Sequence, residues 1–287
     1  MENIKIIECP RDAMQGIKMF IPTEKKVQYI QSLLRVGFDT IDFGSFVSPK
    51  AIPQMVDTAE VLSKLDLTTT KSKLLAIVAN VRGANDASIH PEIQYLGYPF
   101  SISENFQMRN THKTIAQSIE TLQEILNIAA KTNKEVVAYL SMGFGNPYGD
   151  PWNVEIVGEW TEKLSNMGVK ILSLSDTIGS STPDVIDYLY SNLIPKYPEI
   201  EFGAHLHTTP SSWHEKIDAA YKAGCRRFDG AIQGFGGCPM AKDELTGNMP
   251  TEKMVSYFTT VKANSGVQTM SFESSYNEAS KIFNYYH

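Results

Sequence analysis

The chain has 287 residues, of which 42% are hydrophobic and 20% charged, a balance typical of a folded globular protein. Its net charge is −6 and its acidic and basic residues are interspersed, which excludes a broad basic surface for nucleic acid. Every apolar run is shorter than the roughly 18 residues that a membrane-spanning helix needs, so we expect no nucleic-acid partner and no membrane association.

The cysteines and the N-terminal segment indicate the cellular compartment of the protein. Cys9, Cys225 and Cys238 lie far apart, which argues against a disulfide framework and for reducing surroundings. The opening MENIKIIECP lacks the apolar core of a signal peptide and is typical of a strand. We therefore expect a cytoplasmic protein, and because no linker rich in Pro, Gly or Ser interrupts the chain, residues 1–287 are predicted to form a single catalytic domain.

Short apolar segments rich in β-branched residues recur along the chain, and amphipathic segments with helical spacing separate them. The predicted strands are 4–9, 40–46, 74–79, 92–100, 135–144, 170–177, 199–209 and 227–234. The predicted helices are 22–37, 53–65, 80–89, 113–132, 154–168, 182–194, 211–224 and 251–264, with one extra helix over 272–286.

Eight strand–helix pairs in succession predict an α/β fold, a (β/α)8 TIM barrel with an additional C-terminal helix. A doubly wound open sheet is the alternative that the same alternation allows. Barrels of this kind hold their active sites at the C-terminal ends of the strands, so polar residues there are the candidates for function. The aromatic C-terminal helix is expected to pack on the barrel or on a partner, and we expect a homodimer.

Two histidines one residue apart end the seventh predicted strand, in EFGAHLHTTP. Because side chains alternate along a strand, His205 and His207 share one face. Asp12, at the end of the neighbouring first strand once the barrel closes, is a natural third ligand, and Asn248 can supply an amide oxygen. Imidazoles combined with oxygen donors suit a divalent metal ion, so the pattern predicts a metal site.

Other polar residues at strand ends allow two interpretations each. Arg11 and Asp12 form either a solvated pair in a loop or a functional pair. Asp42 lies inside an apolar strand and must be paired or liganded, because an isolated buried charge is costly. Asp176 is either a turn residue or a functional acid. Cys238, in the glycine-rich GFGGCP, is either a chance thiol or a proton-transfer group at the barrel mouth.

Together these residues resemble the hydroxymethylglutaryl-CoA lyases, within a wider group of metal-dependent barrel lyases and acyltransferases. The matching stretches run in order over nearly the whole chain: ECPRDAMQ (8–15), FGSFVSPKAIPQM (43–55), SDTIG (175–179), HLH (205–207), GFGGCP (234–239) and TGNMPTE (246–252). SFVSPK and GGCP are specific to the lyase branch, whereas PRD and HxH are shared by the wider group.

The resemblance implies a divalent-metal-dependent carbon–carbon lyase that cleaves 3-hydroxy-3-methylglutaryl-CoA, an acyl-CoA, to acetyl-CoA and acetoacetate through an enolate. The cofactor would be Mg²⁺ or Mn²⁺. The implied metal ligands are Asp12, His205, His207 and Asn248.

The same resemblance implies the catalytic groups. Arg11 would hold the thioester carbonyl and stabilise the enolate, and Cys238 would be the catalytic acid or base. Asp42 stands at the position of a functional glutamate, and Asp176 at that of a functional aspartate. The residues implied to contact the substrate are Arg11, Gln15 and Ser45.

Several positions depart from the family pattern. Ala13 stands where the pattern has glycine, Asp42 replaces glutamate, Asn146 stands where many members carry cysteine, and Thr208 follows the second histidine in place of an acid. These positions lie near strand ends, where specificity would be set. The alternatives are therefore a lyase for a different 3-hydroxy acyl-CoA or hydroxy acid, and a Claisen-type acyltransferase. A non-catalytic barrel would have no use for the full set of site residues.

Overall fold

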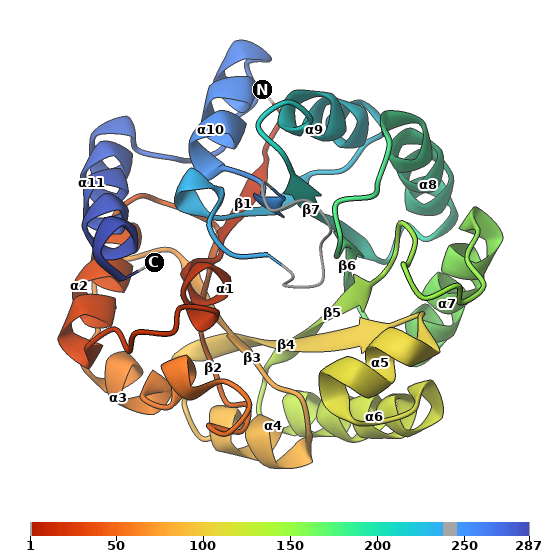
Figure 1. Cartoon of the computed structure of the whole chain (residues 1–287), viewed down its shortest axis with the longest axis horizontal. Coiled ribbons are helices and arrows are strands. Elements are labelled where there is room, and N and C mark those ends of the chain that lie inside the picture. The colour runs from red at the N-terminus through yellow and green to blue at the C-terminus, as the bar shows by residue number, and fades with distance from the viewer. Residues whose placement is uncertain (1, 238–245, 287) are drawn as a thin grey trace.

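A computed structural model of the chain describes residues 2–237 and 246–286. Parallel strands form a closed barrel in the order β6-β5-β4-β3-β2-β1-β8-β7, and the pairing of β6 with β7 closes it (Figure 1). The strands are β1 (Lys5–Glu8), β2 (Thr40–Ser45), β3 (Lys73–Ile77), β4 (Ile93–Ser101), β5 (Glu135–Ser141), β6 (Ile171–Asp176), β7 (Glu201–Thr208) and β8 (Arg227–Gly230). The predicted TIM barrel is confirmed, and the open sheet is excluded.

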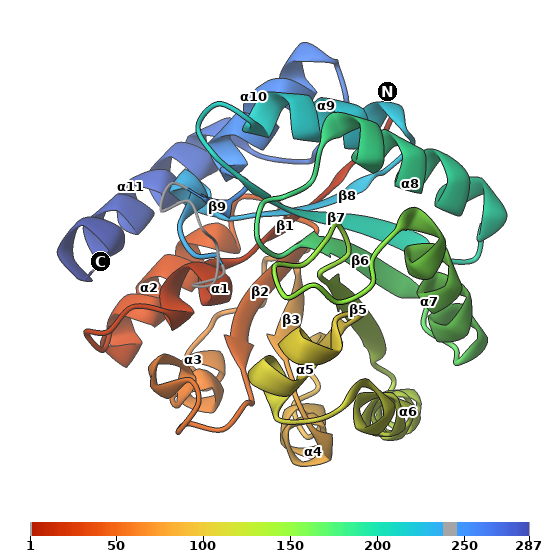
Figure 2. The same cartoon turned by 45° about the vertical axis from the view of Figure 1, so that its right-hand side comes forward.

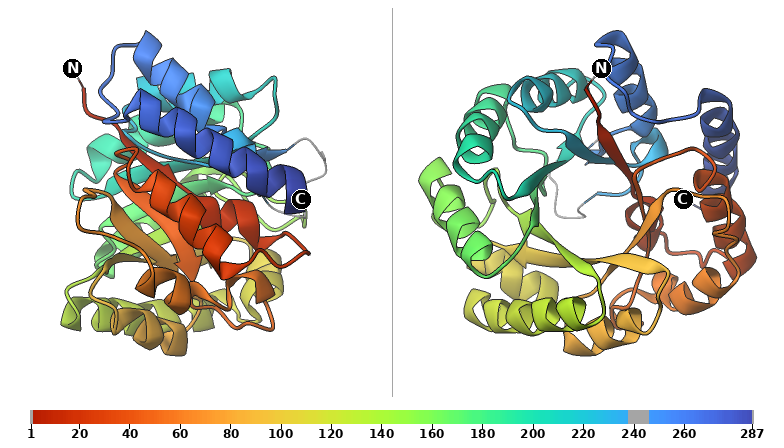
Figure 3. Two further views of the ribbon diagram at one scale, coloured as in Figure 1. Left: turned by 90° about the vertical axis from the view of Figure 1, so that its left-hand side faces the viewer. Right: turned by 180° about the vertical axis from the view of Figure 1, so that it is seen from behind.

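Helices surround the barrel as an outer ring, which the rotated views of Figures 2 and 3 show from other sides. They are α1 (Pro10–Gln15), α2 (Thr23–Leu33), α3 (Thr58–Ser63), α4 (Val81–Ser88), α5 (Glu104–Thr111), α6 (Ile115–Lys131), α7 (Val154–Asn166), α8 (Pro183–Lys196), α9 (Trp213–Lys222), α10 (Thr251–Thr260) and α11 (Thr269–Tyr286), with 3-10 helices η1 (Pro53–Met55) and η2 (Ile232–Gly234). None of these described helices is long and apolar enough to cross a bilayer.

The additional C-terminal helix is confirmed as α11. It packs on α2 of its own chain, where the rings of Phe283 and Tyr29 meet edge to face with centroids 6.0 Å apart. Part of its aromatic surface is therefore covered by the barrel's own helices.

Local structure differs from the sequence-based expectation in a few places. The stretch PRDAMQ, expected in a loop, forms α1 with Pro10 at its start, where the missing N–H and fixed φ of proline are favourable. The single helix expected over 53–65 is divided into η1 and α3, and α5 forms where no helix is predicted. A short strand, β9 (Gly247–Asn248), pairs antiparallel with β7.

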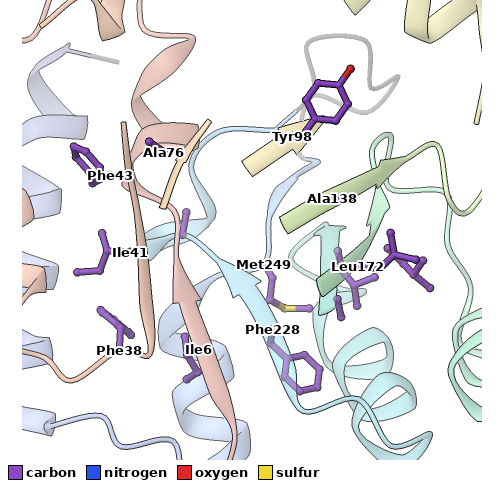
Figure 4. Packing of buried hydrophobic residues seen from close by; sticks show 14 of the residues in the cluster. Ile6, Phe38, Ile41, Phe43, Ala76, Tyr98, Ala138, Leu172, Phe228 and Met249 are labelled. Atoms are coloured by element: carbon purple, nitrogen blue, oxygen red, sulfur yellow. The ribbon is translucent and has the colours of Figure 1, made fainter. Parts of the chain in front are cut away.

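Apolar side chains fill two regions, one between the barrel and its helices and one inside the barrel. Figure 4 shows part of the outer region, including Ile6, Ile41, Leu172 and Phe228. The inner cluster consists of Leu75, Ile77, Tyr95, Val137, Tyr139 and Ile171, all from β3 to β6. Buried polar side chains also stand on the barrel strands, among them Asp42 on β2, Ser173 and Asp176 on β6, and Arg227 and Asp229 on β8.

Glu8, at the end of β1, is fully buried and joins this strand to two distant segments. Its carboxyl group accepts hydrogen bonds from the Ile232 N–H at 2.9 Å and from the Thr251 hydroxyl at 2.6 Å. Burial raises the pKa of Glu8 to about 8, although these two hydrogen bonds oppose the increase. Ile232 and Thr251 flank the segment that carries Asn248, so Glu8 anchors both sides of it.

This pKa predicts how stability depends on pH. Between pH 4.5 and about 8 the native protein retains a proton on Glu8 that the unfolded chain has released. The free energy of unfolding therefore falls as pH rises through this window, by up to about 1.4 kcal/mol per pH unit. Glu8→Gln is neutral at every pH, so urea unfolding between about pH 5 and 8 should show a flatter dependence than in the wild type. Identical slopes in the two proteins would contradict a protonated Glu8.

Candidate active site

A cavity of about 330 Å³ lies at the C-terminal ends of the barrel strands, where (β/α)8 barrels hold their active sites. Its wall combines polar and apolar side chains. The polar ones include Arg11, Asp12, Gln15, Thr177, His205 and His207. The apolar ones include Val47, Ile52, Ile77, Pro99 and Phe106. Five residues predicted from the sequence, all of them polar, thus meet at one cavity.

His205 and His207 both face the cavity from β7, as the alternation of side chains predicts. Nδ1 of His207 lies 2.9 Å from the carbonyl oxygen of Thr177. A carbonyl only accepts, so Nδ1 carries the proton and Nε2 has a free lone pair. That Nε2 is buried and has no hydrogen-bond partner among the described residues. Nδ1 of His205 lies 3.1 Å from Oδ2 of Asp229 on β8, so each ring is held through Nδ1.

Asp12 and Asn248 complete the cluster from opposite ends of the chain. The ligand atoms of Asp12, His205 and His207 all lie within 4.8 Å of one another. The short strand β9 pairs Asn248 with His207, and the Asn248 amide donates a hydrogen bond to Asp12 Oδ2 at 2.7 Å. The structure therefore brings together all four predicted metal ligands.

The charge states of Asp12 and His207 suit a cation. Burial alone would raise the pKa of Asp12, but the charge of Arg11, with smaller contributions from other neighbours, lowers it to about 2. Burial and the neighbouring His205 lower the pKa of His207 to about 4. At neutral pH Asp12 is thus a carboxylate and His207 a neutral imidazole, the forms that bind metal ions. A cation here would also satisfy the unpaired Nε2 of His207, so the residues fit a metal ion.

Arg11 is buried in the first turn of α1, so the interpretation as a solvated loop pair is wrong. Its Nε donates to Asp42 at 3.0 Å, and Nη1 donates to Asp12 at 2.8 Å and to Gln15 at 3.0 Å. Nη2 also donates to Asp42, so four of the five N–H groups are occupied. The remaining Nη2 N–H has no partner among the described residues. Burial alone would lower the pKa of Arg11, but the two carboxylates raise it and keep the group charged.

Asp42 and Ser45 lie on β2 and are not among the residues that line the cavity. Asp42 is fully buried, and burial raises its pKa to about 6, an increase that the Arg11 guanidinium limits. The Ser45 hydroxyl accepts a hydrogen bond from the Val47 N–H at 3.2 Å. Asp42 is thus the hydrogen-bonding partner of Arg11. Ser45 lies in the turn before Val47, which lines the cavity.

Asp176, at the end of β6, is also buried outside the cavity wall. Its carboxylate accepts hydrogen bonds from Lys216 Nζ at 2.7 Å and from the Ser181 N–H at 3.1 Å. Lys216 donates in addition to the carbonyl oxygen of His207 at 2.9 Å. This ion pair joins β6 and α9 to the backbone of His207.

The remaining predicted positions have simpler surroundings. Cys238 lies outside the described residues, and the preceding Gly237 lines the cavity. The Asn146 side chain accepts hydrogen bonds from the N–H groups of Tyr148 and Asp150 at 3.0 and 3.1 Å, so it shapes the turn after β5.

Three buried residues beside the site are not predicted from the sequence: Cys9, Lys216 and Asp229. Asp229 had a usable signal, because an acid inside a predicted barrel strand needs a partner, as Asp42 does. Cys9 and Lys216 had none, since only the closed fold brings them to His205 and Asp176.

Known proteins are similar to this chain over most of its length. The HMGL-like family profile matches residues 3–277. A hydroxymethylglutaryl-CoA lyase of Bacillus subtilis is 34% identical over 246 residues, which cover 86% of this chain and 81% of that protein. A cytoplasmic 3-hydroxy-3-methylglutaryl-CoA lyase of Rattus norvegicus is 31% identical over 269 residues, which cover 93% and 77%.

Solved structures show the same relationship. The HMG-CoA lyase of Bacillus subtilis matches with a TM-score of 0.92 and 30% identity, covering 99% of this chain and 95% of that one. An HMG-CoA lyase from Acinetobacter baumannii, solved in complex with coenzyme A and 3-methylmalate, matches with a TM-score of 0.89 and 27% identity over 98% and 91%. The similarity therefore spans the whole barrel.

Proposed function

The chain belongs to the HMGL-like family, and we propose that it is a divalent-metal-dependent carbon–carbon lyase that cleaves 3-hydroxy-3-methylglutaryl-CoA to acetyl-CoA and acetoacetate. The observation that carries this proposal is the meeting of Arg11 with Asp12, His205 and His207 at one cavity. The lyases to which the chain is similar over most of its length support the same reaction.

Asp12, His205, His207 and Asn248 are the proposed ligands of the cation, Mg²⁺ or Mn²⁺. Carboxylate and amide oxygens suit both ions, and the two imidazoles suit a transition metal such as Mn²⁺. When bound, the cation supplies Lewis-acid polarisation of the substrate oxygens.

The chain's own groups account for the movement of charge. Cleavage transfers the proton of the tertiary hydroxyl to a base, proposed to be the thiolate of Cys238, and breaks the bond to the methylene beside the thioester. The hydroxyl carbon becomes the ketone of acetoacetate, and the electron pair becomes an enolate. The unpaired N–H of Arg11 donates to the thioester oxygen as this charge develops. Cys238 is proposed to return a proton to the methylene carbon, which yields acetyl-CoA.

Four further residues support these groups in the proposal. Gln15 lines the cavity, bonds both Arg11 and Asp12, and is placed to contact the substrate as well. Asp42 orients the guanidinium, and Asp176 acts through Lys216 on the backbone of His207. Ser45 acts on the substrate side by shaping the turn that presents Val47.

The acyl-CoA substrate is supported by the related lyase solved with coenzyme A. Asn146 supports the alternative substrate, a different 3-hydroxy acyl-CoA or hydroxy acid. Many family members have a cysteine at this position, whereas Asn146 shapes a turn. We also propose a cytoplasmic homodimer. The cytoplasmic rat relative supports the location, and the exposed Met270 and Tyr285 of α11 support a second copy as partner.

Substrate identity is tested by acetyl-CoA release from a panel of 3-hydroxy acyl-CoA thioesters in the presence of Mg²⁺ or Mn²⁺. We expect 3-hydroxy-3-methylglutaryl-CoA to have the highest kcat/KM, by about 10-fold or more over analogues that differ by one methylene. Turnover of another thioester without turnover of this one would establish the alternative.

The metal site is tested by titrating Mn²⁺ into chelator-treated protein and measuring heat. Wild-type protein should bind, and His205→Ala and His207→Ala should lose detectable binding, because each removes a ligand to a buried cation. His214→Ala, an exposed histidine in α9, is the control and should bind as the wild type does. Undiminished binding by both site variants would remove the metal assignment.

Arg11 is tested by Arg11→Lys, which keeps a cation beside buried Asp42 but loses the forked guanidinium. We expect kcat to fall by about 100-fold or more, because transition-state stabilisation at the enolate oxygen is lost. The unfolding temperature should change little, since the ammonium still pairs with Asp42. A near-native kcat would rule out the role at the enolate.

A further inference from the structure

A second polar cluster lies beneath the proposed metal site, inside the barrel. Asp229 on β8 is in register with His205 on β7, and its side chain is fully buried. Ligand atoms of Cys9, His205 and Asp229 lie within 4.8 Å of one another. His205 therefore belongs to two groups, with Asp12 and His207 on its cavity side and with Cys9 and Asp229 on the other.

The layer around Asp229 holds several polar atoms without hydrogen-bond partners among the described residues. They are Asp229 Oδ1, the three guanidinium nitrogens of Arg227, the Ser173 hydroxyl and the Tyr139 hydroxyl. Arg227 precedes Asp229 by two positions on the same strand and face, and is only 1% exposed. Such groups need ordered water in the folded protein, and a buried carboxylate needs a positive charge nearby. The positive charge of Arg227 interacts with Asp229, and its Nη1 also lies 3.7 Å from Oε1 of Glu201.

We infer that Asp229 is a positioning residue of the metal site. It accepts the hydrogen bond of His205 Nδ1 at 3.1 Å, which fixes the tautomer and turns Nε2 toward Asp12 and His207. Arg227, two positions earlier on the same strand, adds a positive charge that acts on both Asp229 and Glu201. This inference rests on the proposed metal-dependent function.

The competing arrangement is an ion held by Cys9, His205 and Asp229 themselves. Two observations disfavour it. His205 Nδ1 and Asp229 Oδ2 are already hydrogen-bonded to each other, and the Cys9 thiol donates to the carbonyl oxygen of Ile7. The cavity is lined by His205 but by neither Cys9 nor Asp229. The inference therefore places Asp229 behind the ligand and not among the ligands.

The test is the Mn²⁺ dissociation constant of chelator-treated wild type, Asp229→Asn, Asp229→Ala and Cys9→Ala, measured by calorimetry or by the Mn²⁺ electron-spin-resonance signal. Partners behind a metal-binding histidine typically change metal affinity about 10- to 100-fold. The affinity of Asp229→Ala for Mn²⁺ should be lower than that of the wild type by a factor in that range. Asp229→Asn should lie between it and the wild type, because the amide oxygen still accepts from Nδ1 without the charge. Cys9→Ala alters packing at the same depth and should stay within about twofold.

Each result decides between the roles. A purely structural Asp229 would lower the unfolding temperature of the metal-free variants without this graded loss of affinity, and Mn²⁺ binding within twofold of wild type in folded Asp229→Ala would overturn the inference. If Asp229→Ala does not fold, unchanged affinity in Asp229→Asn overturns it equally. Loss of binding in Cys9→Ala would show that the ion lies in the lower group. Failure of the wild type to bind Mn²⁺ would instead refute the proposed metal function itself.

Discussion

The pairing of β1 with β8 joins the first and last strands of the barrel and, with them, the two ends of the site. Glu8 lies opposite Gly230 in this pairing, and β8 in turn holds Asp229 opposite His205. Residues 236 positions apart, Asp12 and Asn248, are hydrogen-bonded only because of this pairing. A shift of one residue in the register of β7 would turn both histidines from the cavity toward the helices. The contacts among the proposed metal ligands thus depend on strand register.

The site contains several buried charged side chains. Because an isolated buried charge is costly, nearly every one of them has a partner of opposite charge. Arg11 lies between Asp12 and Asp42, and Lys216 is paired with Asp176. Removing one member of such a buried pair typically costs about 3–5 kcal/mol, which holds the remaining groups in a single geometry. Against this background, the unpaired atoms are informative. Nε2 of His207 and one N–H of Arg11 stay unused among the described residues, and these atoms would meet the cation and the thioester oxygen in the proposed reaction.

The sequence predicts those parts of the site that depend on local periodicity. Alternation along one strand is enough to place His205 and His207 on a common face, and repeated strand–helix pairs are enough for the barrel. Sequence alone does not show that Asp176 is paired with Lys216, because that contact joins β6 to α9, three elements later in the chain. Nor does it show that Asn248 reaches the cluster through a two-residue strand, since no pattern marks so short an element. Long-range side-chain pairing is what periodicity does not encode.

Apolar side chains in the cavity wall strengthen the interactions of its polar groups. β3, β4 and the segment after β2 contribute side chains such as Ile77, Pro99 and Val47 to this wall. These side chains keep water from the space where the enolate charge would develop, and a charge interacts more strongly with a fixed donor in such surroundings. The same wall would contact the hydrocarbon part of the substrate. In the proposed reaction, ion binding and charge stabilisation therefore belong to α1, β7 and β9, whereas discrimination among acyl groups would depend on the apolar side chains from β3, β4 and the segment after β2.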